Sequence, residues 1–294
     1  MKGLNTDWTS KQWNERYFPA GDLDGDGDTW GMRWRGMEKM RYASYLAVLD
    51  QHLRGPDPLR ILDIGCALCD FTTRAWKLNT DNQFSCVDIS TNAIAWASSQ
   101  YPQFEFKTGA LPDIPFEGEF DLIFCLQILV YLDSAGRKAS LKNMHDHLSP
   151  SGKVMFSGML SLEEYHTEEE VRELFAEGFD ILHLRYNYWM LHQKLIEFPL
   201  QKISPVIERM LELLQMPREE FQEFLAGKSG SAKFVVLKVL RLLNPLTTWL
   251  VRLMSGTVRL IRGSRILAVI LSKVQKVLSG GKNPDEIVVL AVRK

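Results

Sequence analysis

Short apolar runs alternate with stretches of helical spacing along most of the chain. The runs have the length of strands, and most are apolar at nearly every position, as in strands covered on both faces. They lie at residues 60–64, 84–89, 104–109, 120–125, 153–157, 179–184 and 286–292. Helical stretches lie at residues 36–53, 71–78, 91–101 and 133–148, and another begins after Thr167. This alternation predicts an α/β fold with a doubly wound, mostly parallel, seven-stranded sheet.

Two carboxylates end neighbouring strands of this predicted sheet. The strand at 60–64 contains Asp63 and breaks at Gly65, and a helical stretch follows. Such a turn brings backbone N–H groups close to a ligand above the sheet edge. The next strand ends in Asp88, roughly twenty residues later, where a nucleoside-binding unit places the acid that accepts the ribose hydroxyls. The pair therefore indicates nucleoside binding.

The dinucleotide fingerprint G-x-G-x-x-G is absent, because Ala67 and Asp70 occupy two of its glycine positions. No pyrophosphate is therefore expected against the backbone, and the pattern suits an adenosine that carries a sulfonium and an amino acid. In this region the chain resembles the class I S-adenosylmethionine (SAM)-dependent methyltransferases, which implies a Rossmann-like methyltransferase fold with SAM as the cofactor.

Within that class, the chain resembles the nodulation-type N-methyltransferases, which methylate a free amine on a chitooligosaccharide. The matching segments are Asp28–Trp30, Met37–Tyr42, Asp63–Thr72 and Phe120–Leu132. The resemblance implies that Asp63 and Gly65 hold the methionine end of SAM and that Asp88 and Ile89 hold the adenosine. The full set of cofactor-binding residues that we expect is Trp30, Tyr42, Asp63, Gly65, Ala67, Asp88, Ile89, Ala110, Leu111 and Gln127.

Three departures from that family affect the site. Cys69 stands at the second loop glycine, and Ala110 with Leu111 offers only backbone where many relatives have an adenine-binding Asp. Gln127 replaces a Glu, and an amide cannot take a proton at neutral pH. The amine specificity of the family therefore does not transfer to this chain.

Methyl transfer from a sulfonium is a direct displacement, so the enzyme mainly aligns and desolvates the reactants. We expect Gln127 and Tyr131 to orient the acceptor, with Ser157 near them and His166 as a candidate base. The predicted reaction transfers a methyl group to an N or O atom of a small-molecule, sugar or lipid-linked acceptor. The alternative is a SAM-binding or partner-binding or membrane-binding protein with a degenerate active site.

The resemblance also implies three parts. Residues 1–55 form an N-terminal lid and helix, in which the helix at 36–53 covers the cofactor. Residues 56–188 and 285–294 form the SAM-binding core, whose last strand inserts antiparallel between the fifth and sixth. Residues 189–284 are an insertion before that strand.

The insertion is strongly basic. Residues 228–282 contain eleven Lys or Arg and no Asp or Glu, and their apolar residues recur at helical spacing. The longest uncharged run, 242–251, is too short to span a membrane. A basic amphipathic helix is typical of interfacial membrane binding. We therefore expect contact with an anionic membrane surface through 228–282; the alternatives are packing on the core or a homodimer interface.

Composition excludes other classes of partner and site. The net charge of −1, and the lack of aromatic residues interleaved with the basic ones, argue against nucleic-acid binding.

Of the four cysteines, Cys66 and Cys69 form a C-x-x-C, but no second such pair or His pair accompanies it, so no metal site is predicted. No secretory signal is visible, which suggests a cytoplasmic protein that lies peripheral to the inner face of the membrane.

Residues 22–28 carry aspartates at the spacing of the front half of a calcium loop, but Arg33 replaces the bidentate Glu at its end. A cation site and an acidic surface turn both remain open here.

Overall fold

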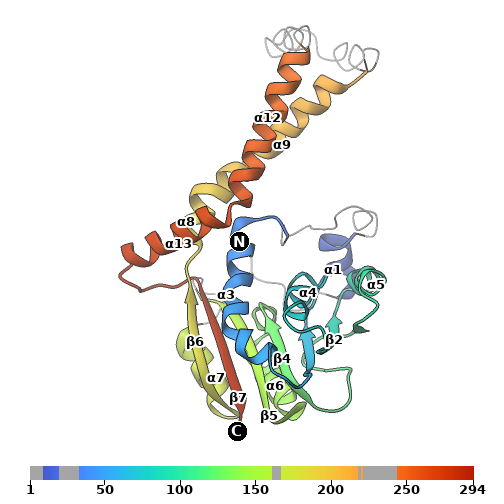
Figure 1. Cartoon of the computed structure of the whole chain (residues 1–294), viewed down its shortest axis with the longest axis vertical. Helices are drawn as coiled ribbons and strands as arrows, with labels where there is room; N and C mark the ends of the chain where they lie inside the picture. Colours follow the sequence, from blue (N-terminus) through green and yellow to red (C-terminus); the bar gives the residue numbers. More distant parts are fainter. Residues whose placement is uncertain (1–8, 20–32, 161–166, 218–219, 221–243) are drawn as a thin grey trace.

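A computed structural model describes residues 9–19, 33–160, 167–217, 220 and 244–294. Its centre is a seven-stranded sheet in the order β3-β2-β1-β4-β5-β7-β6 (Figure 1). The strands are β1 (Arg60–Ile64), β2 (Gln83–Asp88), β3 (Glu105–Thr108), β4 (Phe120–Leu126), β5 (Leu148–Met159), β6 (Phe179–Asn187) and β7 (Glu286–Arg293). β7 pairs antiparallel with both β5 and β6, which confirms the predicted sheet and its last strand.

Helices cover both faces of the sheet. On one face α6 (Ser134–Asp146) and α7 (Glu168–Ala176) bury Met144 and Phe175. On the other face lie α3 (Gly36–Leu53), α4 (Asp70–Trp76) and α5 (Thr91–Gln100). α7 begins with the capping box that the sequence contains, in which Thr167 and Glu170 cap each other's backbone N–H groups.

α3 corrects the expectation that residues 36–53 form a lid. Tyr45, Leu49 and Leu53 are buried in the sheet core, so this helix is part of the core layer. The element that lies over the strand-end loops is α1 (Ser10–Tyr17), which the apolar pattern does not predict. α1 belongs to the N-terminal part. Hydrogen bonds of Asn14 hold it, and Tyr17 and the following Phe18 pack in a small apolar cluster with Leu68 and Ala93.

The insertion begins with α8 (Met190–His192) and a π-helix (Gln193–Glu197). It continues through α9 (Phe198–Gln215), α12 (Asn244–Gly263) and α13 (Arg265–Leu278). α9 and α12 lie side by side and project from the body as an arm, while α13 packs against α3 (Figure 1). At the base of the arm, Glu197 pairs with Arg35 at 3.2 Å and with Arg262 at 3.3 Å. In the described part of the chain, no helix has the length and apolar character needed to cross a bilayer.

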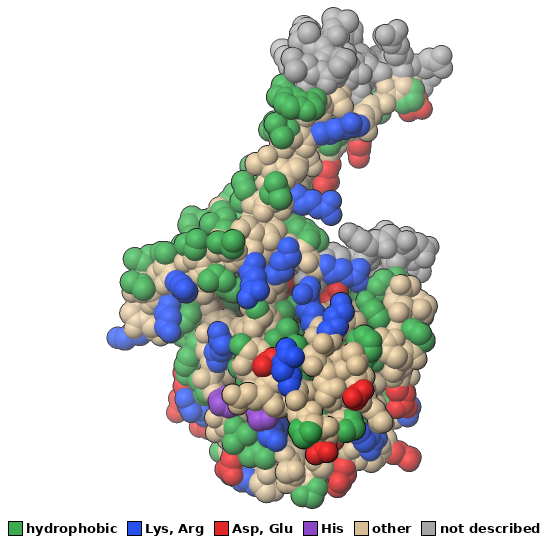
Figure 2. Space-filling view, viewed as in Figure 1, with side chains coloured by type: hydrophobic (Ala, Val, Ile, Leu, Met, Phe, Trp, Pro, Cys, Tyr) green, Lys and Arg blue, Asp and Glu red, His purple; other side chains and the backbone are tan. Residues whose placement is uncertain are grey.

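The arm exposes apolar side chains to solvent. Among the described residues, every exposed large apolar side chain except Leu182 belongs to the insertion. On α12 these are Trp249, Leu250, Leu253, Met254, Leu260 and Ile261, and on α13 they are Ile266, Ile270, Val274, Val277 and Leu278. The view in Figure 2 shows apolar side chains along the arm and α13, with Lys and Arg gathered near the base of the arm. α12 uses a different side chain, the buried Val251, to pack on Ile207 of α9.

Candidate active site

The backbone of the loop after β1 is left-handed at three residues, a conformation that residues other than glycine rarely adopt. Gly65, Ala67 and Cys69 have φ of 74°, 46° and 59°, in the left-handed region. A Cβ at Gly65 would lie 2.1 Å from Cδ1 of Ile128, and φ there is one that L side chains rarely adopt, so the position favours glycine. Cys69 adopts the backbone shape of the glycine that it replaces. The N–H groups of Gly65 and Cys66 both donate to the Val87 carbonyl, which fixes this loop beside the end of β2.

Asp88 lies beside that loop at the end of β2. One carboxylate oxygen accepts the Ala67 N–H at 2.9 Å and the other accepts the Ser90 N–H at 2.8 Å. Each oxygen keeps a further lone pair for a ligand hydroxyl. Burial raises the pKa of Asp88 to about 6, although the two N–H groups lower it. The residue therefore fits the ribose of SAM.

Asp63, on the neighbouring strand, accepts a hydrogen bond from the Thr72 hydroxyl at 2.5 Å. Burial raises its pKa to about 7, opposed by Thr72, and the charge of Asp88 adds to the rise. Two carboxylates with raised pKa values at adjacent strand ends are typical of a functional site. A bound sulfonium cation would favour the ionised form of both, so the pair fits a positively charged cofactor.

α1 lies over this edge of the sheet. Asn14 donates to the Thr91 hydroxyl at 2.8 Å and accepts from the Ser90 hydroxyl at 2.6 Å, next to Asp88. Trp13 meets the ring of Tyr131 edge-on, with centroids 5.1 Å apart. Tyr131 is thus under α1, in the 3₁₀ helix Leu129–Tyr131 that follows β4.

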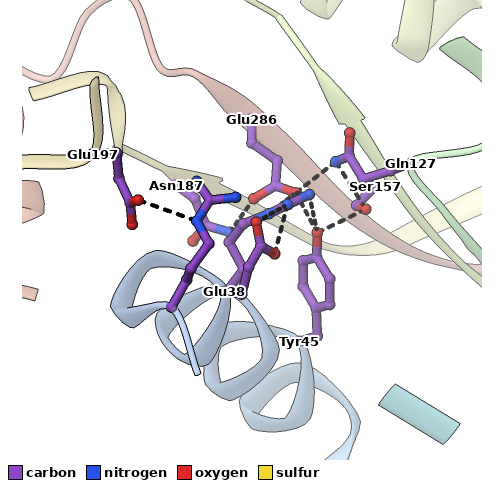
Figure 3. Close-up of polar contacts among 9 residues, drawn as sticks. Glu38, Tyr45, Gln127, Ser157, Asn187, Glu197 and Glu286 are labelled. Atoms are coloured by element: carbon purple, nitrogen blue, oxygen red, sulfur yellow. Dashed lines mark hydrogen bonds and ion pairs between the residues drawn. The ribbon is translucent and has the colours of Figure 1, made fainter. Parts of the chain in front are cut away.

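A second cluster, which we call the buried network, lies at the same edge of the sheet, where β4 and β5 end and β7 begins (Figure 3). Gln127 donates to the Glu286 carboxylate at 2.6 Å and to the Ser157 hydroxyl at 3.2 Å. Tyr45 donates to Glu286 and lies 3.0 Å from the Ser157 hydroxyl. Burial raises the pKa of Tyr45 well above its ordinary value, so it stays a donor. The buried Oε1 of Gln127 has no hydrogen-bond partner among the described residues.

Arg41 holds the charges of the buried network together. Its guanidinium donates to Glu38 at 2.9 Å and to Glu286 at 3.1 Å, and Asn187 donates to the other Glu286 oxygen at 2.7 Å. Burial alone would lower the pKa of Arg41, but the two carboxylates raise it well above its ordinary value. Two carboxylates and one guanidinium leave the network with one excess negative charge when all three are ionised.

The structure brings some predicted site residues together and separates others. Gln127 and Ser157 meet in the buried network, whereas Tyr131 lies apart from it under α1. Tyr42 packs against Phe71 between α3 and α4, at 5.5 Å between ring centroids, rather than in a lid.

The remaining predicted residues follow the ends of β2 and β3, where the Gly109 N–H donates to the Asp88 carbonyl at 3.0 Å. These residues are Ile89, Ala110 and Leu111. Trp30, His166 and the aspartate-rich loop 22–28 lie outside the described residues.

The sequence analysis did not predict Glu286, Arg41 and Tyr45 as site residues. Glu286 begins the last strand, and an antiparallel strand starts at the edge where its parallel neighbours end. The expected direction of that strand was therefore the signal that could have placed Glu286 at the site.

Residues 61–152 match the family model described as a methyltransferase domain. Residues 61–152 therefore carry a methyltransferase domain. S-adenosylmethionine is the cofactor of such a domain, and the positions of Asp63 and Asp88 fit it. Many solved structures share this fold, and two of them are described below. No curated protein matches the chain.

One of these structures is the N-methyltransferase NodS from Bradyrhizobium japonicum WM9, in complex with S-adenosyl-L-homocysteine. It is 21% identical, with a TM-score of 0.51, over 61% of this chain and 90% of that chain. The other is the [4+2]-cyclase SpnF, 14% identical, with a TM-score of 0.58, over 99% of this chain and 98% of that chain. At these identities the likeness concerns the fold, which in the second case extends over the insertion.

The buried network generates a stability prediction. Replacing Arg41 with Met leaves Glu38 and Glu286 buried without their partner, and we expect a loss of about 3–5 kcal/mol in the free energy of unfolding. The matched control is Arg172→Met, which breaks a solvent-exposed pair with Glu168 and should change that free energy by less than about 1 kcal/mol. Urea denaturation of both variants measures this, and equal losses would contradict the assignment.

Proposed function

We propose that the chain transfers a methyl group from SAM to an N or O atom of a small-molecule, sugar or lipid-linked acceptor. The observation that supports this most strongly is the Gln127 Oε1 atom, buried and without a partner among the described residues at the edge where Asp63 and Asp88 lie. An acceptor N–H or O–H can donate to this oxygen, which would orient the lone pair that attacks the methyl carbon.

Glu286 supplies the carboxylate that position 127 lacks. Its hydrogen bond from Gln127 holds the amide with its oxygen available to the acceptor. Arg41 and Tyr45 donate to the buried Glu286 carboxylate, so a carboxylate charge lies next to Gln127 at this edge of the sheet. This charge favours an acceptor that carries a positive charge, such as an ammonium group before its proton is lost to solvent.

SAM, when bound, supplies an electrophilic methyl group on a sulfonium. In our proposal Asp88 holds its ribose hydroxyls, and Asp63 and the loop of Gly65 and Ala67 hold its methionine end. α1 and Tyr131 would cover this edge of the sheet and exclude water from it. The competing function is SAM binding without methyl transfer. The chain shares its fold with a [4+2]-cyclase, so the tests below include this function as a possible outcome.

The cofactor assignment predicts the effect of Asp88→Asn. The substitution removes a charged acceptor from the ribose hydroxyls, and a hydrogen bond to a charged group contributes about 1.5–3 kcal/mol. The affinity for S-adenosylhomocysteine should fall roughly 10- to 100-fold by calorimetry. Asp121→Asn is the control, since Asp121 binds Arg60 and Ser149 near the start of β4. Unchanged binding by D88N would remove Asp88 from the site.

The acceptor assignment predicts the effect of Gln127→Met. A screen of amines, sugars and lipids for added methyl mass identifies an acceptor, and the variant should then turn over at least about 10-fold more slowly. Its affinity for SAM should be unchanged, because the hydrogen bonds that it loses go to the acceptor, Glu286 and Ser157 and none goes to the residues proposed for SAM. Gln100→Met at the exposed end of α5 is the control. Normal turnover by Q127M would reject the role of Gln127, and SAM binding with no methylated product would favour the competing function.

We also propose that the protein is cytoplasmic and binds the inner face of the membrane through α12 and α13. Their described side chains include Arg252, Arg259, Arg265, Lys273 and Lys276, and no carboxylate accompanies them. Exposed apolar residues flanked by basic ones complement an anionic leaflet, to which each basic residue contributes about 1 kcal/mol. The base of the arm adjoins the buried network through Glu197 and Arg35 (Figure 3), so docking would place a lipid-linked acceptor near Gln127.

The membrane proposal predicts that the protein co-sediments with vesicles containing phosphatidylserine and much less with pure phosphatidylcholine. Ile266, Ile270 and Val277 lie on one face of α13 and are 76%, 51% and 78% exposed. Replacing all three with Asp should abolish the binding. Leu182→Asp, an exposed apolar position on β6, is the control and should bind normally. Equal sedimentation with and without vesicles would reject the proposal. If the wild type is a dimer and the triple variant is not, the exposed face of α13 would instead bind a second copy of the chain.

A further inference from the structure

Three cysteine thiols converge beneath the loop that follows β1. The Sγ atoms of Cys66, Cys69 and Cys86 all lie within 4.8 Å of one another. All three side chains are buried, with exposed fractions of 7%, 0% and 0%. The Sγ atoms of Cys69 and Cys86 are 3.9 Å apart, which is nearly twice the length of a disulfide bond. The cluster is therefore a set of free thiols.

The backbone fixes where these thiols lie. Cys66 and Cys69 are joined by a tight turn in which the Cys69 N–H donates to the Cys66 carbonyl at 2.8 Å. Cys86 lies within β2, in register with Asp63 of β1. The sequence shows only the C-x-x-C, since the third thiol comes from a strand that becomes a neighbour on folding. Three sulfur atoms are thus held together by elements that the core already orders.

The spacing suits one metal ion. A metal–thiolate bond is about 2.3 Å, so three sulfur atoms arranged around an ion in one plane lie about 4.0 Å apart. The cluster contains no His or carboxylate ligand among the described residues. Structural zinc sites take four ligands, whereas a set of soft thiolates selects monovalent copper among other thiophilic ions.

We propose that Cys66, Cys69 and Cys86 form a three-thiolate site for monovalent copper. Each thiol gives its proton to solvent as its sulfur–copper bond forms, and the copper keeps its oxidation state. The proposal does not depend on methyl transfer, because it uses the three thiol side chains, whereas the proposed function uses the backbone of the loop that carries Cys66.

The test is an anaerobic titration of the full chain with Cu(I) against a coloured Cu(I) chelator. We expect one ion per chain and a sulfur-to-copper charge-transfer band in the near ultraviolet. Cys66→Ser, Cys69→Ser and Cys86→Ser should each weaken binding by more than about 10-fold. Loss of a group that only hydrogen-bonds a metal ligand already costs about 10- to 100-fold in metal affinity. Cys125→Ser is the matched control, a buried thiol on β4 outside the cluster, and should bind as the wild type does.

X-ray absorption on the copper-loaded wild type tests the site without any variant. It should show three sulfur neighbours at about 2.3 Å. Failure to retain copper against the chelator, nitrogen or oxygen neighbours, or equal weakening by C125S would each overturn the proposal. Tighter binding of Zn(II) with the same cysteine dependence would overturn the assignment to copper.

Discussion

The pairing of Glu286 with Arg41 is the interaction on which the buried network depends. A carboxylate that is fully buried must be neutralised or paired, because desolvation of an isolated charge is far too costly. Arg41 supplies the pairing from α3, and Tyr45, Gln127 and Asn187 satisfy the remaining lone pairs. The pair and its hydrogen bonds therefore join α3, the ends of β4 and β6 and the start of β7 at one point, and they fix the positions of Gln127 and Asn187.

The same edge of the sheet collects the cofactor residues for a topological reason. Parallel strands β1, β2, β4 and β5 all end there, so the loops after them lie side by side. The antiparallel β7 begins at that edge and brings Glu286 to it. The residues that we propose for the cofactor and for the acceptor thus arise from one sheet edge. The first come from loops close in sequence, and the second come from contacts across the whole chain.

Local pattern in the sequence was sufficient for most of the fold. The strand 60–64 and the helix 36–53 match the bounds of β1 and α3, because uniform apolar runs and helical spacing both reflect burial. α1 was missed because its eight residues are mostly polar and its position depends on contacts with Ser90 and Thr91. Asp63 and Asp88 were predictable from strand ends, whereas Arg41 and Glu286 are 245 positions apart and meet only in the folded chain.

The insertion leaves the sheet at the end of β6 and returns at the start of β7, and these two strands are antiparallel neighbours. The Asp285 N–H donates to the Asn187 carbonyl at 3.0 Å, so both ends of the insertion meet at one rung of the ladder. In topological terms the whole insertion, which includes the arm and α13, is the loop of a β-hairpin formed by β6 and β7. A hairpin loop can lengthen or shorten at little cost to the strands it joins, since closure entropy grows only slowly with length. The size and composition of the arm are therefore free to vary with what it contacts, while the sheet beneath it stays the same.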